Sequence, residues 1–220
     1  MIFDQIFKNS KKIAVVFSSN TVLKKNMGKF IDNFDEVIRF NRAPTLGYEK
    51  YIGRRTTLRV INNSVFQNIM PHPNQNWTID INFTKKLKNT KILVVSPIKL
   101  DFLTRKENEN TSNSYFYITQ NRSLKSYLLS LSKKKDILLF LHLIIYFYLF
   151  RKNLSVGCLV AIYLSILNFE VNLFGYNPNE KNSRSHYWEK AGNIGNHHNL
   201  NFEKIMINNL IKKNLLKIRC

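Results

Sequence analysis

Short apolar runs separated by polar segments recur along the chain, and their length and composition predict strands. Most of these runs are rich in Val, Ile, Leu and Phe and are bounded by Ser, Asn, Gly or Pro. Such runs are typical of strands that are buried on both faces of a parallel sheet. The pattern predicts strands at residues 12–17, 35–41, 56–61, 91–96, 136–142 and 170–176.

Two longer segments predict helices. Residues 156–167 are apolar at nearly every position, which indicates a buried helix, and Gly157 and Ala161 would let it approach the sheet closely. Residues 201–213 predict an amphipathic helix. Its apolar face would consist of Phe202, Ile205, Met206, Leu210 and Ile211. Alternating strands and helices predict an α/β fold, in which residues 1–220 form a single Rossmann-like domain with a mainly parallel sheet flanked by helices.

Polar residues and glycine stand where several predicted strands end. Asn41, Ser96, His142 and Gly175 each occupy such a carboxyl end. In open parallel sheets, ligands bind in the crevice beyond the carboxyl ends of the strands. The sequence therefore predicts a ligand site at this edge of the sheet.

The chain is strongly basic, with 34 Lys and Arg against 14 Asp and Glu and a formal net charge of +20. This charge favours an anionic partner, namely nucleic acid, acidic lipid or a phosphorylated substrate. The lysines are scattered, and no segment has the spacing of a known nucleic-acid-binding motif. A basic nucleic-acid-binding protein thus remains the alternative from another class, and we expect peripheral contact with an anionic membrane instead.

The compartment is predicted from one apolar run and from the cysteines. Residues 137–150 are apolar except for His142, but 14 residues are fewer than the roughly 20 that a spanning helix needs. Cys158 and Cys220 have no metal-ligand spacing and are not expected to form a disulfide. We therefore expect a cytoplasmic protein, soluble or bound peripherally to the inner face of the membrane.

Three histidines lie within 13 residues, at His186, His197 and His198. Histidine suits general-base catalysis near neutral pH. A zinc site is disfavoured, because adjacent histidines rarely point at one metal and no Cys or Asp completes a ligand set. A solvated surface loop is the other interpretation that the residues leave open.

A second polar segment follows the predicted strand 35–41. Asn41 precedes Ala-Pro-Thr at 43–45, and Arg-Arg-Thr-Thr at 54–57 opens the next strand. An Asn amide can contact a base or a sugar, and Arg and Thr suit phosphate. A turn with solvated arginines is the alternative.

These segments resemble the sialyl motifs of glycosyltransferase family 29, the eukaryotic-type sialyltransferases. Residues 34–59 resemble the large motif, with Arg-x-Asn-x-Ala-Pro-Thr-x-Gly-Tyr-Glu from Arg39 onward, and residues 154–175 resemble the small motif. His-Tyr-Trp-Glu at 186–189 matches the third motif, and His198 with Glu203 matches the very small motif. The four motifs occur in the family's order.

The resemblance implies a GT-A-like variant of the Rossmann fold and an inverting transfer of sialic acid from CMP-sialic acid to a glycan hydroxyl. It implies that His198 is the general base and that His186 hydrogen-bonds the departing CMP phosphate. The donor-binding residues that it implies are Ser18, Asn20, Asn41, Ser155, Gly157 and Gly175. The partners would be CMP-sialic acid and an acceptor glycan, which could be linked to a lipid, and not nucleic acid.

No metal and no other cofactor is expected. A nucleoside monophosphate needs less counter-charge than a diphosphate, and the chain has no Asp-x-Asp to hold a metal. Ser18 stands where the family has an asparagine, for which Asn20 could substitute, and Val156 replaces a threonine. These departures leave a catalytically weakened CMP-binding member as an alternative. The family's disulfide and membrane anchor have no counterpart, which implies a bacterial-like member.

Overall fold

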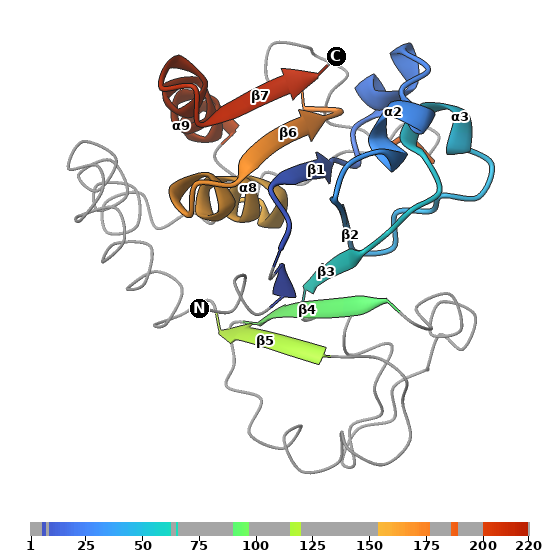
Figure 1. The fold of residues 1–220 in the computed structure, drawn as a ribbon, viewed down its shortest axis with the longest axis horizontal. Helices are drawn as coiled ribbons and strands as arrows, with labels where there is room; N and C mark the ends of the chain where they lie inside the picture. Colours follow the sequence, from blue (N-terminus) through green and yellow to red (C-terminus); the bar gives the residue numbers. More distant parts are fainter. Residues whose placement is uncertain are drawn as a thin grey trace.

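The computed structural model is built on a parallel sheet of seven described strands in the order β5-β4-β3-β2-β1-β6-β7 (Figure 1). It describes residues 6–7, 9–62, 65, 90–96, 115–119, 154–176, 186–188 and 200–219. All six described strand pairs are parallel. The predicted parallel α/β sheet is therefore confirmed, while the extent of the domain over residues 1–220 stays a prediction.

Five predicted strands are present with ends shifted by at most two residues. They are β1 (Lys12–Val16), β2 (Glu36–Phe40), β3 (Leu58–Asn62), β4 (Lys91–Ser96) and β6 (Glu170–Phe174). Each has neighbours on both sides within the sheet, so each appears in the sequence as a continuous apolar run. The strand predicted at 136–142 lies outside the described residues.

Two strands were not predicted, and both lie at the ends of the strand order. They are β5 (Tyr115–Thr119) and β7 (Leu216–Arg219). In β7, Lys217 and Arg219 alternate with Leu216 and Ile218, so no continuous apolar run marks it. Polar alternation is typical of a strand with neighbours on one side only.

The direction of the chain across the sheet reverses at β1. The strands from β2 to β5 follow one another on one side of β1, and β6 and β7 lie on the other side. Ala14 of β1 is thus in register with both Val37 of β2 and Asn172 of β6. In folds of this kind, ligands bind beyond the carboxyl ends of the strands at such a reversal. We call the region beyond the carboxyl ends of β1 and β6 the crevice.

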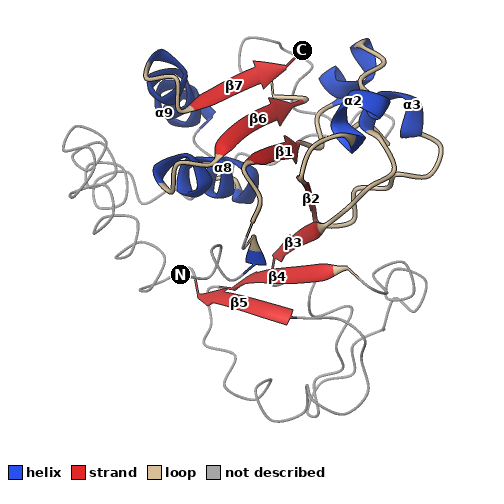
Figure 2. Ribbon diagram, in the orientation of Figure 1, coloured by secondary structure: helices blue, strands red, loops and turns tan. Residues whose placement is uncertain are grey.

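Helices cover both faces of the sheet (Figure 2). One face carries α8 (Val156–Ile166) and α9 (Leu200–Lys212), whose apolar residues share a cluster with Ile13 and Val15. The other face carries η1 (Asn20–Lys24), α2 (Gly28–Asp32) and α3 (Glu49–Ile52), which share a cluster with Ala14 and Val16. Alternate residues of β1 thus enter opposite layers, as the pleat of a strand requires.

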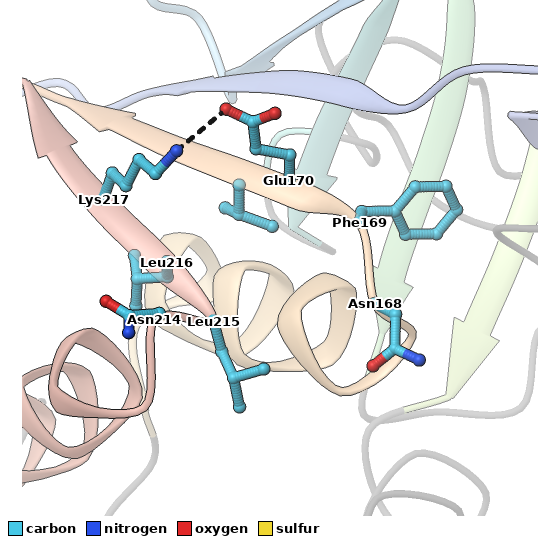
Figure 3. Close-up of a pocket in the computed structure, with 8 residues that line it drawn as sticks. Asn168, Phe169, Glu170, Asn214, Leu215, Leu216 and Lys217 are labelled. Atoms are coloured by element: carbon cyan, nitrogen blue, oxygen red, sulfur yellow. Dashed lines mark hydrogen bonds and ion pairs between the residues drawn. The ribbon is translucent and has the colours of Figure 1, made fainter.

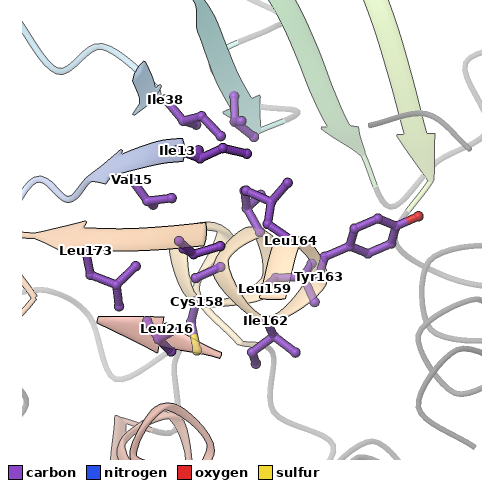
Figure 4. Close-up of a cluster of buried hydrophobic side chains, with 14 of the residues drawn as sticks. Ile13, Val15, Ile38, Cys158, Leu159, Ile162, Tyr163, Leu164, Leu173 and Leu216 are labelled. Carbon is purple, nitrogen blue, oxygen red and sulfur yellow. The ribbon is translucent and has the colours of Figure 1, made fainter. Parts of the chain in front are cut away.

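The larger apolar cluster is centred on α8. Ten of its eleven residues are buried, and Cys158, Leu159 and Leu164 lie in the same cluster as Val15 of β1 and Leu173 of β6 (Figure 4). The predicted buried helix is therefore confirmed. Cys158 is a free thiol, and burial raises its pKa well above the ordinary value, so it is inert at neutral pH.

Helix α9 occupies its predicted position, but one residue of its predicted apolar face is wrong. Ile205 is 50% exposed, whereas Ile207 is fully buried beside Phe202, Met206 and Leu210. The prediction assigned the apolar face from the spacing of residues within α9 alone. Which side of the helix packs against the sheet cannot be read from that spacing. No helix in the described part of the chain has the length and apolar character to cross a bilayer.

Both helices of this face end in the same turn before the following strand. Asn168 after α8 and Asn214 after α9 have left-handed φ angles of 65° and 55°. The next residue of each turn donates a backbone hydrogen bond back into the helix, from Phe169 to Leu164 at 3.2 Å and from Leu215 to Leu210 at 2.9 Å. These are Schellman caps with asparagine at the left-handed position, which aim β6 and β7 in parallel.

Candidate functional site

Most of the predicted site residues lie around the crevice at the carboxyl ends of the strands. Ser18 and Asn20 follow β1, Asn41 follows β2, and Gly175 follows β6. Ser155 and Gly157 lie at the amino end of α8. His186 is paired with Ser19 through an isolated antiparallel bridge. His198, His197 and His142 lie outside the described residues.

The ends of β1 and β6 are held together closely. The backbone N–H of Phe17 donates to the carbonyl of Phe174 at 2.8 Å. Gly175 follows with a φ of 72°, and a Cβ at this position would lie 2.9 Å from the Cβ of Val22 in η1. Glycine is thus required at position 175 both for its backbone angle and for the contact with η1.

Residues 186–188 lie against the end of β1. The N–H of Tyr187 donates to the carbonyl of Ser18 at 2.9 Å, next to the bridge between Ser19 and His186. The structure therefore brings the histidine of the third motif to the β1 end of the crevice. The imidazole of His186 is stacked on the indole of Trp188.

Tyr187 joins this segment to the loop that follows β2. Tyr187 is 6% exposed, its ring packs edge-on against Tyr48, and its hydroxyl donates to the carbonyl of Pro44. Burial raises the pKa of Tyr187 to about 12, against the opposing effect of Arg39 and Arg59. The phenol is therefore neutral near pH 7 and acts as a hydrogen-bond donor.

Asn41 has a left-handed backbone and a side chain that is partly used by the fold. Its φ is 45°, and its Oδ1 accepts a hydrogen bond from the N–H of Asn62 at 3.0 Å. The group that Asn41 can offer to a ligand is thus the amide nitrogen, a donor. A donor suits a phosphate oxygen or a carbonyl of a base.

Two buried arginines fix the segment between β2 and β3, which begins with Asn41. Arg39 donates to the carbonyls of Ile52 and Gly53 at 2.6 and 3.2 Å. Arg59, its partner in register on β3, donates to the carbonyls of Asn41 and Ala43 at 2.9 and 3.0 Å. Burial lowers the pKa of each arginine to about 10, so both remain charged near neutral pH. The loop is therefore fixed by charged donors on its backbone carbonyls.

The Arg-Arg-Thr-Thr segment at 54–57 contributes to the same framework. Thr56 accepts from Nε of Arg39 at 3.0 Å, and Arg55 donates to the carbonyls of Asp32 and Phe34, both at 2.6 Å. Arg55 is exposed and also bonds to the fold, so the structure does not decide between the phosphate-binding interpretation and the turn with solvated arginines. The sequence could not indicate these bonds, because the partners of Thr56 and Arg55 lie 17 to 23 residues away.

Ser155 caps α8 with the help of a residue from α9. Its Oγ accepts from the N–H of Cys158 at 3.3 Å and donates to Oε2 of Glu203 at 3.0 Å. Oε1 of Glu203 accepts the N–H of Ser155, and Glu203 is 2% exposed. In a capping box the third helical residue supplies this carboxylate. Here Glu203 supplies it from another helix, so the small and very small motifs meet.

Glu203 was absent from the predicted site residues, although its place in the very small motif was a signal for it. Gly157 has a packing role: a Cβ there would lie 2.6 Å from the ring of Phe17 at the end of β1. Ser155 and Gly157 thus fix the start of α8 near the end of β1, and their predicted role in donor binding stays a prediction.

Asn20 is the site residue with an unused polar atom. Its Oδ1 is buried and has no hydrogen-bond partner in the described structure. A buried carbonyl oxygen without a donor is costly, which a ligand N–H or O–H would relieve. The described residues contain no group of three His, Cys, Asp or Glu that could hold a metal ion.

A pocket of about 290 Å³ lies at the opposite edge of the sheet, at the amino ends of β6 and β7 (Figure 3). It is lined by residues of the two Schellman turns and by Glu170, which pairs with Lys217 at 3.2 Å. The hydrogen bond from Lys217 lowers the pKa of Glu170. None of the predicted site residues lines this pocket, so the crevice remains the candidate site.

Comparison with known proteins decides the family. The model of glycosyltransferase family 29 (sialyltransferase) matches residues 5–215. This chain belongs to family 29. A segment of 60 residues is 48% identical to beta-galactoside alpha-2,6-sialyltransferase 2 of Danio rerio, and one of 62 residues is 45% identical to that of Homo sapiens. These matches cover 27% and 28% of this chain and 12% of each relative.

Solved structures of sialyltransferases share the fold. A mammalian sialyltransferase in complex with Gal-beta-1-3GalNAc-ortho-nitrophenol aligns with a TM-score of 0.63 at 19% identity, over 96% of this chain and 69% of that protein. The sialyltransferase CstII of Campylobacter jejuni in complex with cytidine-5'-monophosphate aligns with a TM-score of 0.56 at 15% identity, over 96% and 79%. The resemblance and the fold class inferred from the motifs are thus confirmed.

Proposed function

We propose that this family 29 protein transfers sialic acid from CMP-sialic acid to a glycan hydroxyl with inversion. The observation that carries the proposal is the meeting of three sialyl motifs at one crevice. His186 lies beside the end of β1, Asn41 lies on the loop after β2, and Ser155 lies at the start of α8. A mammalian relative binds a galactose-containing acceptor and CstII binds CMP, which supports a nucleotide-sugar donor and a glycan acceptor.

The donor would be held by polar groups at the crevice. The amide nitrogen of Asn41 would donate to the nucleotide, and the buried Oδ1 of Asn20 would accept from the cytosine amine or a ribose hydroxyl. Ser18, beside the segment that carries His186, and Gly175 would border the same pocket. This assignment needs no metal, since a monophosphate leaving group carries less charge than a diphosphate.

In the transfer step, the acceptor oxygen forms a bond to the anomeric carbon as the bond from that carbon to the phosphate oxygen breaks. The acceptor proton passes to His198, and CMP leaves with the bonding electrons. His186 would donate to the phosphate as its charge develops, because donors aimed at developing charge lower a barrier most. The role of His198 rests on its place in the very small motif.

The proposal is tested with CMP and with CMP-sialic acid. Calorimetric titration of CMP with and without EDTA should give the same affinity, and Asn41→Ala should weaken binding by roughly 1–3 kcal/mol.

Incubation of CMP-sialic acid with lactoside and sialoside acceptors, analysed by mass, should yield a sialylated product. His198→Ala should lower turnover about 10²–10⁴-fold with donor affinity nearly unchanged, and His197→Ala is the matched control. A strict metal requirement, or loss with His197→Ala alone, would contradict these assignments.

A catalytically weakened CMP-binding protein is the second candidate. Ser18 and Val156 replace polar residues of the family motifs, and this observation favours it. CMP binding without transfer or hydrolysis of CMP-sialic acid would support this candidate over the enzyme. Binding of neither compound would contradict both.

We further propose that the protein is cytoplasmic and attaches peripherally to an anionic membrane, where a lipid-linked acceptor would lie. The net charge of +20 supports electrostatic attachment. Because salt screens such attraction, a high-salt wash should release the protein from membranes. Release by detergent alone would contradict this attachment.

A further inference from the structure

The side chains of His186 and Trp188 form a parallel stack at the edge of the crevice. Their ring centroids are 4.5 Å apart and their planes differ by 10°. Stacked aromatic rings at this separation attract each other beyond the simple burial of their area. The contact therefore favours one orientation of the imidazole.

The backbone beneath the stack is fixed from both sides. Ser19 bridges His186, and the carbonyl of Ser18 accepts the N–H of Tyr187 at 2.9 Å. The ring of Tyr187 is buried between Tyr48 and Trp188, with both ring centroids at 4.8 Å. The Cα positions of the segment are thus set by the fold.

A fixed backbone does not set the plane of an imidazole, because rotation about χ2 of histidine has a broad energy profile. A ring stacked on a neighbouring indole loses this freedom, and its two nitrogens then lie in a plane parallel to that indole. A hydrogen bond to a phosphate oxygen depends on that plane, since it weakens steeply as the donor angle falls.

We propose that Trp188 is a positioning residue for His186, which fixes the imidazole plane so that a ring N–H meets the departing phosphate. This inference rests on the proposed function, because it assumes that His186 acts on the phosphate of CMP. The requirement is for an aromatic ring at position 188. Phenylalanine should therefore substitute for tryptophan, and leucine should not.

A double-mutant cycle on the full chain tests the coupling. Trp188→Leu should lower kcat for transfer from CMP-sialic acid by about tenfold, the size of one aromatic contact, with a smaller change in the KM for the acceptor. Trp188→Phe should stay within about threefold of wild type. In the His186→Gln background, Trp188→Leu should cause no further loss, because residues that act as a unit are not additive. Additive losses would overturn the proposal.

Tyr48→Leu is the matched control. It removes the other edge-on contact of Tyr187 and leaves the stack of His186 and Trp188 in place. Its effect on kcat should add to that of His186→Gln. Equal non-additivity for Tyr48→Leu would mean that general loosening of the segment explains the result, which would overturn the role of Trp188.

NMR of the histidine rings separates this inference from the proposed function. In wild type, the His186 ring protons should show an upfield ring-current shift that Trp188→Phe keeps and Trp188→Leu loses, with the resonance assigned by His186→Gln. Absence of that shift would overturn the stack.

If the shift is present but CMP does not move the resonance, the proposed role of His186 fails, and the positioning role fails with it. If CMP moves it equally in wild type and Trp188→Leu, with equal kcat, only the positioning role is overturned.

Discussion

The two faces of the sheet are stabilised in different ways. The face under α8 and α9 is an apolar layer built from side chains that interlock across helices and strands. The face under η1, α2 and α3 has a smaller apolar cluster and, beside it, two buried arginines that hydrogen-bond to backbone carbonyls. The second face carries the loop after β2 and the segment of His186, so much of the crevice depends on hydrogen-bond geometry rather than on packing volume.

Replacement of Arg39 should have the largest effect on stability. Arg39→Met keeps much of the side-chain volume but leaves the buried carbonyls of Ile52 and Gly53 without a donor. At about 1–3 kcal/mol for each unsatisfied group, the free energy of unfolding should fall by about 2–6 kcal/mol in urea denaturation. Arg54→Met, at an exposed neighbouring arginine, should change it by less than about 0.5 kcal/mol. A stable Arg39→Met protein would show that the two faces do not differ.

The apolar face should respond to volume instead. Leu164 of α8 is fully buried in the larger cluster. Leu164→Ala should lower the free energy of unfolding by about 2–5 kcal/mol through the cavity it leaves, while Leu164→Met should cost less than about 1.5 kcal/mol. The same denaturation experiment measures both. If Leu164→Met lowered the free energy of unfolding as much as Leu164→Ala, side-chain shape rather than volume would determine the stability of this face.

The Schellman turns of the apolar face should contribute less. Asn214→Ala places a residue with a Cβ and no compensating side-chain hydrogen bond at a φ of 55°, which should cost about 1–2 kcal/mol. Asn214→Gly should be neutral or slightly stabilising, because glycine adopts this conformation readily. Thermal unfolding compares the pair, and Asn168 offers the same test in the other turn. Equal melting temperatures for the alanine and glycine variants would contradict the role of the left-handed backbone.

The smallest effect concerns the exposed carboxylate of Asp35, next to β2. It accepts the N–H groups of Lys12 and Lys11 at 2.8 and 2.9 Å, and these hydrogen bonds lower its pKa below the usual 3.8. An acid with a lowered pKa stabilises the fold above its unfolded value and loses that contribution as pH falls through its folded value. The difference in the free energy of unfolding between wild type and Asp35→Asn should thus be constant from pH 7 to 5 and should vanish as the pH falls below 3.8. A difference that grew on acidification would contradict this.

The sequence could predict the interior strands and α8 because their burial appears as continuous apolar runs, and α9 because its apolar residues have helical spacing. It could also place Asn41 and Gly175 at the carboxyl edge, since each directly follows a strand. It could not predict the short helices η1, α2 and α3. Their positions depend on contacts such as that of Arg55 with the carbonyl of Asp32, which no local pattern encodes.

The limits at the site have the same physical cause. The capping of Ser155 by Glu203 joins residues 48 positions apart, and the bond from Tyr187 to Pro44 spans 143. All four residues lie in or next to the family motifs, but the resemblance could not indicate which of them bond to each other. Ser155 and Asn41, predicted to bind the donor, also bond within the fold through the hydroxyl of Ser155 and the amide oxygen of Asn41.

The central place of β1 also sets an order of events during folding. Its residues pair with β2 about 20 positions away and with β6 about 160 positions away. Closing a chain segment costs about 0.6 kcal/mol more for each doubling of its length, so the β1–β6 pairing is disfavoured by about 2 kcal/mol relative to β1–β2. The β1–β3 region should therefore assemble first, and the crevice, which needs β6, should form late. In a refolding experiment, nucleotide binding should recover after most of the secondary structure.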